Sequence, residues 1–118
     1  MELARRAITG GGVSVLDMYL ENGRLFLRET DTGSAPDAVF GGGGVEYYLS
    51  IRGEERLVKM LQLLGTELGR DLVVLLDDDG LRRLADALLE RFGDGLDLLK
   101  DFRTWLAVSG VEFRTQVV

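Results

Sequence analysis

The first half of the chain alternates between apolar and polar positions, the pattern of strands with one buried face. Two such runs lie within residues 13–29 and flank Asn22-Gly23, the dipeptide that a type I′ hairpin turn favours. If this dipeptide is the two-residue loop, the register of the whole hairpin follows by counting outward. The inner pairs are then Leu20 with Leu25 and Met18 with Leu27.

The same register defines the other side of the hairpin. Tyr19 faces Phe26 there, and Asp17 faces Arg28. An aromatic pair and an oppositely charged pair on one side of a ribbon both favour this register. The sequence therefore predicts a hairpin with an apolar inner face and an aromatic, charged outer face.

A third strand is predicted over Val45–Ile51, after a glycine-rich connection at residues 31–44. One face of this strand carries Val45, Tyr47, Leu49 and Ile51, and the other carries Glu46, Tyr48 and Ser50. The length of the connection leaves the neighbours of this strand in the sheet open. Residues 3–9 either add an edge strand or remain loose.

Beyond Gly53 the apolar period changes from 2 to 3.6 residues, which indicates helices. The first is expected over Glu54–Leu64 with Gly65 as its stop, and the clearest over Leu81–Phe92 with Asp79 as its cap and Gly93 after its end. Residues 71–76 fit a buried strand or a helical turn equally well.

A last helix is expected from about Gly95 to Val108, ended by Gly110, with Leu99, Phe102 and Leu106 buried and Trp105 beside them. An alternating strand over Val111–Val118 closes the chain. Strands followed by helices indicate an α+β fold: an antiparallel sheet of about four strands with two to three helices packed on one face. At 118 residues, the chain is expected to form a single domain, residues 1–118.

Composition narrows the function classes. The net charge of −6 disfavours nucleic acid and membrane surfaces as partners and favours a basic protein, although an acidic surface also serves solubility alone. Histidine and cysteine are absent, which removes histidine-based catalysis, disulfides and most zinc sites. With no apolar stretch typical of a leader or a membrane span, we expect a cytoplasmic, non-catalytic protein without a cofactor.

Two segments of the sequence are candidate ligand sites. Asp77-Asp78-Asp79-Gly80 would fit a calcium loop only with Leu75 in place of the first ligand, so an acidic helix start is the better interpretation and no metal is expected. The glycine runs at residues 10–12 and 41–44 lack the lysine and the following helix of a phosphate loop.

The strongest candidate surface is therefore the outer face of the sheet. Aromatic side chains with charged neighbours are typical of protein interfaces. The partner-binding candidates are Asp17, Tyr19, Phe26, Arg28, Glu46 and Tyr48. The alternative is that residues 1–12 or 31–44 cover this face within the chain itself.

The segments Val45–Ile51, Phe102-Arg103-Thr104-Trp105-Leu106 and Gly110-Val111-Glu112-Phe113 give the chain a family resemblance. Their layout resembles small actinobacterial-type α+β proteins, some of which look like immunity proteins of polymorphic toxin systems. The resemblance implies an acidic inhibitor that binds a cognate basic toxin domain and carries no catalytic motif. A self-associating structural or regulatory domain, with the same face forming a homodimer, is the alternative.

Overall fold

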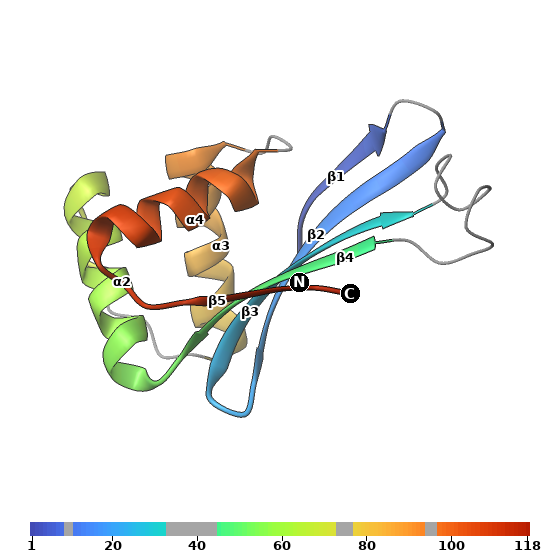
Figure 1. Ribbon diagram of the computed structural model, residues 1–118. Coiled ribbons are helices and arrows are strands. Elements are labelled where there is room, and N and C mark those ends of the chain that lie inside the picture. The colour runs from blue at the N-terminus through green and yellow to red at the C-terminus, as the bar shows by residue number, and fades with distance from the viewer. Residues whose placement is uncertain (9–10, 33–44, 73–76, 94–96) are drawn as a thin grey trace.

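The computed structural model describes residues 1–8, 11–32, 45–72, 77–93 and 97–118. Four strands come first in the chain, three helices follow, and a fifth strand completes the order (Figure 1). The strands are β1 (Glu2–Ile8), β2 (Gly12–Glu21), β3 (Arg24–Thr32), β4 (Val45–Arg52) and β5 (Arg114–Val117). The helices are α2 (Glu54–Leu68), α3 (Asp78–Phe92) and α4 (Leu98–Ser109).

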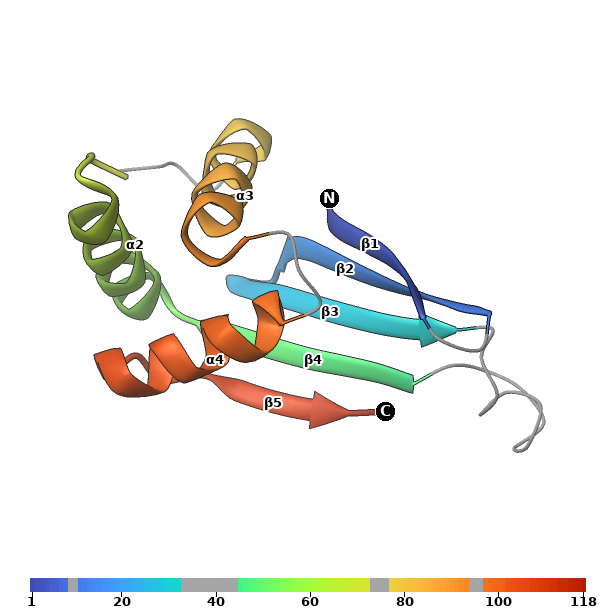
Figure 2. The ribbon, with the colours of Figure 1, turned by 90° about the horizontal axis from the view of Figure 1, so that it is seen from above.

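The strands form one antiparallel sheet in the order β1-β2-β3-β4-β5. Figure 2 shows them side by side in this order. The described chain thus has five strands where about four were expected, because residues 2–8 form β1 along β2 rather than remaining loose. β5 pairs with β4 only after the chain has passed through all three helices.

The hairpin of β2 and β3 has the predicted register. Asn22 and Gly23 have φ angles of 51° and 74°, the positive values that a type I′ turn requires. The four predicted pairs are all confirmed: Leu20 with Leu25, Met18 with Leu27, Tyr19 with Phe26, and Asp17 with Arg28. Turn chemistry and alternation together therefore determined this part of the sheet.

The core lies between one face of the sheet and the three helices, as Figure 1 shows. Met18, Leu27 and Ile51 are fully buried on the sheet side. Phe102 of α4 is fully buried on the helix side, stacked 6.0 Å from Trp105 between ring centroids. The α+β class with helices packed on one face is confirmed.

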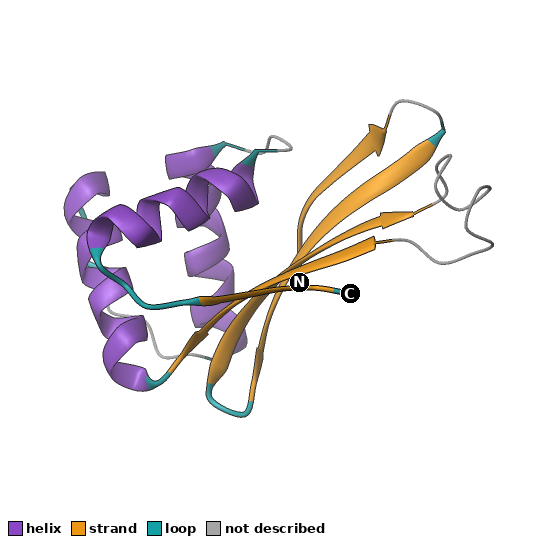
Figure 3. Ribbon diagram, viewed as in Figure 1, coloured by secondary structure: helices purple, strands orange, loops and turns teal. Residues whose placement is uncertain are grey.

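The sheet extends beyond the helical layer, and Figure 3 shows the strand ribbons continuing past the helices. Tyr47 lies on the inner face, as its alternation predicts, yet it is 36% exposed. Tyr47 is paired with Glu29, toward the end of β3 that extends beyond the helices. Its side chain therefore points to the inner face without being buried.

Helix α2 corrects the expectation that Gly65 ends it. The helix continues to Leu68, and Gly69, at φ 70°, forms the left-handed cap. Gly65 is buried inside the helix. A Cβ at this position would lie 2.6 Å from the backbone oxygen of Arg70, which is too close for any residue larger than glycine. Its glycine identity therefore reflects close packing and not a stop.

Of the other helix boundaries, the end of α3 at Phe92 is confirmed, and the remaining ones lie within three residues of the predicted positions. α3 begins at Asp78, and its cap is Asp77 rather than Asp79; the Asp77 side chain accepts a hydrogen bond from the Gly80 amide. α4 begins at Leu98, which is more deeply buried than the predicted Leu99. The glycine stops after these helices, Gly93 and Gly110, are confirmed.

The closing strand is shorter than the predicted Val111–Val118. It spans Arg114–Val117, and Val111 is buried before the strand begins. Of the ambiguous segment at residues 71–76, Asp71 and Leu72 lie in neither helix nor strand, and residues 73–76 lie outside the described chain. Most of the predicted connection, residues 33–44, also lies outside it, as does Gly95.

Candidate functional site

The outer face of the sheet, opposite the helices, carries the sequence-predicted candidates. Residues 1–12 are one candidate cover for it, but Glu2–Ile8 lie in the plane of the sheet as β1. Of the other candidate cover, residues 31–44, Asp31 and Thr32 belong to β3, and residues 33–44 lie outside the described chain. Within the described residues, all three helices pack on the opposite face, so the outer face has no helix over it (Figure 1).

An aromatic pair lies at the centre of the outer face. The rings of Tyr19 on β2 and Phe26 on β3 are stacked, with centroids 5.0 Å apart and planes 10° from parallel. Both side chains are half-buried, although no core residue covers them. Offset-stacked aromatic pairs contribute about 0.5–1.5 kcal/mol beyond their buried area, so the two rings stiffen one another.

Arg28 links this pair to the charged residues beside it. Its Nη2 donates to Oδ2 of Asp17 at 3.2 Å, and its guanidinium lies 5.5 Å from the centroid of the Tyr19 ring. The hydrogen bond to Asp17 raises the pKa of Arg28 above its usual range. The Nε atom of Arg28 is buried without a hydrogen-bond partner among the described residues, which leaves one donor of the fork unused.

Glu46 and Tyr48 on β4 complete the predicted set. The Tyr48 hydroxyl donates to Oε2 of Glu46 at 2.7 Å, and Tyr48 lies directly opposite Arg28 in the β3–β4 register. The hydrogen bond to Glu46 raises the pKa of Tyr48, because ionisation of the phenol would break it. Tyr48 therefore remains protonated at neutral pH and keeps its hydrogen bond to Glu46.

The structure thus brings all six predicted residues onto one face across three neighbouring strands. Asp17 is paired with Arg28, Glu46 accepts a hydrogen bond from Tyr48, and the rings of Tyr19 and Phe26 are stacked. A preorganised surface of this kind is suited to recognition, since little side-chain freedom remains to be lost on binding.

Sequence reasoning missed three arginines at one end of this face: Arg24 on β3, Arg52 on β4 and Arg114 on β5. They surround Ser50, and a hollow of about 450 Å³ lies between Arg24, Ser50 and Arg114 with Phe26 and Tyr48 along it. The predicted third strand ends at Ile51 and leaves Arg52 out, whereas β4 continues to Arg52. Nothing in the sequence indicated that β5 would bring Arg114 next to β4.

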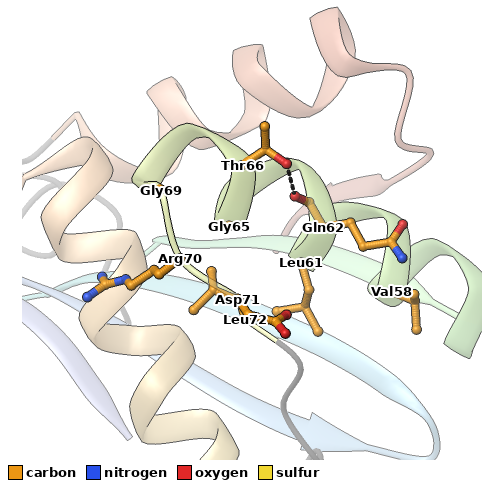
Figure 4. Close-up of a pocket in the computed structure, with 9 residues that line it drawn as sticks. All are labelled: Val58, Leu61, Gln62, Gly65, Thr66, Gly69, Arg70, Asp71 and Leu72. Atoms are coloured by element: carbon orange, nitrogen blue, oxygen red, sulfur yellow. Dashed lines mark hydrogen bonds between the residues drawn. The ribbon is translucent and has the colours of Figure 1, made fainter.

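A larger hollow, of about 680 Å³, lies along α2 and the segment after it (Figure 4). Its threonine and arginine are already engaged: Thr66 donates to the backbone oxygen of Gln62 at 2.9 Å, and Arg70 pairs with Glu90. It borders Leu72, where the described chain is interrupted. We therefore place the candidate site on the sheet and not in this hollow.

The acidic run at the start of α3 has structural partners. Asp77 caps the helix, and Asp79 lies 3.8 Å from Arg83 in an i,i+4 pair. Among the residues that the structure describes, no three acidic, histidine or cysteine side chains gather in a group that could hold a metal ion. The carboxylates of this run thus act on the helix end, where negative charge is favourable.

None of the helices in the described chain is long and apolar enough to cross a membrane. Comparisons of the chain with protein-family models, with curated proteins and with solved structures found no match.

Proposed function

We propose that this chain is a non-catalytic protein-binding domain, and specifically an immunity-type inhibitor that neutralises a cognate toxin by direct binding in the cytoplasm. The observation that carries the proposal is the outer face of the sheet. It presents a stacked aromatic pair, an arginine–aspartate pair and a tyrosine–glutamate pair with no helix over them in the described chain.

The residue types on this face are those that contribute most at protein interfaces. Tyrosine and arginine are enriched among residues whose truncation costs 2 kcal/mol or more, and they cluster near interface centres. Tyr19, Phe26 and Arg28 occupy the centre of the sheet, and neighbouring strands hold them in place. A rigid, amphipathic centre favours slow dissociation, which an inhibitor of a toxin requires.

The charge of the whole chain is consistent with a basic toxin domain as the partner. At −6, the chain attracts a basic protein over distances of about a Debye length, roughly 8 Å at physiological salt. Such steering accelerates association more than it strengthens the final complex. We therefore assign the long-range attraction to the net charge and the final contact to the outer face.

The test is binding to the protein encoded by the neighbouring gene, which the proposal predicts to carry a toxin domain, with affinity measured by calorimetry. We expect tight one-to-one binding that Phe26→Ala and Tyr48→Ala each weaken at least tenfold, because each removes an anchor from the centre. Val108→Ala is the matched control: Val108 is 84% exposed on α4, and its replacement, which changes no charge, should leave the affinity unchanged.

Circular dichroism and thermal unfolding of each variant separate loss of binding from loss of fold. Absence of binding by the folded wild-type chain would overturn the proposal. Equal weakening by Val108→Ala and Phe26→Ala would show that the outer face is not the binding surface.

A self-associating domain remains the second candidate, because the same open face could meet its copy about a two-fold axis. The sheet edges argue against pairing by strand addition. β1 has an irregular register between Glu2 and Ala4 and carries the charged Arg5, and β5 is only four residues long. We expect light scattering at tens of micromolar to report a monomer of 13.0 kDa; a dimer would favour the second candidate.

A further inference from the structure

The three arginines at one end of the outer face form a cluster that the six predicted residues do not explain. Arg24 and Arg52 are direct partners across β3 and β4, and Arg114 is the partner of Ser50 across β4 and β5. Direct partners on neighbouring antiparallel strands have Cβ atoms about 5 Å apart, and positions two residues apart along a strand about 7 Å. Alternation directs all three side chains to the outer face.

The three arginines of the cluster form no salt bridge with the described part of the chain. By contrast, Arg28 pairs with Asp17 and Arg56 pairs with Glu112. Glu112 borders the same end of the face, but Arg56 engages it. Glu21 is the strand partner of Arg24 and makes no ion pair with it.

Unpaired arginines placed side by side are unfavourable for the isolated fold, because like charges directly opposite each other on neighbouring strands repel. This repulsion arises in a chain whose net charge is −6, so carboxylates are plentiful elsewhere on the surface. An anion that enters the cluster removes the repulsion. It also gains the bidentate hydrogen bonds that guanidinium groups offer to carboxylates.

We propose that Arg24, Arg52 and Arg114 form an anion-binding site for carboxylate side chains on a short acidic segment of a partner protein. Two hollows, of about 450 and 540 Å³, both border Arg24, Ser50 and Arg114, and together they give room for more than one carboxylate. Phe26 and Tyr48 line one of them and supply an apolar surface for the backbone of the segment. A long polyanion such as nucleic acid is repelled by the rest of the chain.

This site deepens the proposed function, on which it rests for the identity of the partner as a protein. It divides the outer face into two parts: an aromatic centre, formed by Tyr19, Phe26 and Arg28, and a cationic end, formed by Arg24, Arg52 and Arg114. A partner that is basic overall must then present a local acidic segment to that end. The orientation of the partner on the sheet is fixed by this polarity.

The experiment titrates the isotopically labelled full chain with a hexaglutamate peptide and follows amide chemical shifts by NMR at fixed ionic strength. We expect saturable shifts centred on Arg24, Ser50, Arg52 and Arg114. Arg24→Gln and Arg52→Gln should each weaken binding at least fivefold, and the double variant should abolish it. Arg82→Gln is the matched control, because Arg82 lies on α3, has no ion pair in the described chain and carries the same charge.

Inorganic phosphate in a parallel titration distinguishes the source of the anion. Weaker binding of phosphate than of the peptide, at the same residues, supports an acidic segment; tighter binding of phosphate overturns that assignment. Equal weakening by Arg82→Gln and Arg52→Gln also overturns the proposal, as does the absence of shifts with the folded wild-type chain. Such a failure leaves the proposed function standing, because that is tested separately through Phe26, Tyr48 and the toxin domain.

Discussion

At the scale of single residues, Gly65 and Glu29 show how burial can reverse what local preference indicates. Glycine inside a helix ordinarily costs about 1 kcal/mol relative to alanine. At Gly65 this preference is outweighed, since an added Cβ would lie 2.6 Å from the Arg70 backbone oxygen and 3.3 Å from the Leu72 amide nitrogen. The sequence predicts a helix stop at this position, because hydrophobic periodicity does not show that residues 70–72 pack back against the helix.

We expect Gly65→Ala to lower the free energy of unfolding by about 1–3 kcal/mol, the range for overpacking a tight site. The backbone of residues 70–72 would have to move to admit the methyl group. Urea unfolding measures the change. Thr66→Ala, at the exposed next position of α2, is the control and should change stability little. A stabilised Gly65→Ala variant would contradict the close packing.

Glu29 lies on the inner side of β3, where burial raises the pKa of its carboxyl and the negative charge of Asp31 raises it further. The hydrogen bond with Ser14 acts in the opposite direction. Because the pKa is higher in the folded than in the unfolded chain, folding binds protons. The contribution of Glu29 to stability therefore declines as the pH rises above the ordinary value of 4.5 and through the folded pKa.

We expect Glu29→Gln to stabilise the chain at pH 7 by about 0.5 kcal/mol and to confer no advantage at pH 4. The neutral amide avoids the cost of burying charge and can still hydrogen-bond Ser14. Urea unfolding at the two pH values gives the difference. Glu21→Gln, at an exposed position, controls for the removal of one negative charge. An advantage of equal size at both pH values would refute the titration argument.

At the scale of elements, the features predicted most accurately are those that depend on residues close together in the chain, such as the β2–β3 hairpin. Asn22-Gly23 determined the hairpin and so brought Asp17, Tyr19, Phe26 and Arg28 to one face. Helix ends were predicted less accurately, since Asp77, Asp78 and Asp79 are all good capping residues and only the geometry selects Asp77. The β4–β5 pairing could not be predicted, because short strands do not encode distant partners.

The cap of α3 gives the prediction at this scale. Asp77→Ala should lower the free energy of unfolding by about 1 kcal/mol, because the Gly80 amide would lose its acceptor. Asp77→Ser keeps an acceptor and should retain most of the stability. Asp79→Ala, which removes a carboxylate 3.8 Å from Arg83 on an exposed face, should cost less. Guanidinium unfolding would rank the stability of the three variants. If Asp79→Ala were less stable than Asp77→Ala, Asp79 would be the cap, as the sequence predicts.

At the scale of the whole molecule, the two faces of the sheet have separate roles. The inner face and the helices hold the core, while the outer face carries the candidate site. Alternation predicted which residues of each strand share a face, and the observed β3–β4 pairing brings the six candidate residues together on the outer face. The cationic end escaped prediction because it is assembled from three strands, one of which reaches the sheet only through tertiary packing of the helices.

The position of β5 at the end of the chain has a consequence for the folding kinetics. Tyr47 and Val117 pair across 70 positions of the chain (117 minus 47), so β4 and β5 close the longest loop of the sheet. Pairings of such separation form slowly, because the entropy of loop closure is lost before any contact compensates for it. We expect the hairpin to form early and the β4–β5 ladder late. Arg114 belongs to β5 and joins the other two arginines only when β5 has paired with β4. A partner that requires all three arginines would therefore bind the fully folded chain and not an intermediate in which only β1 to β4 have formed the sheet.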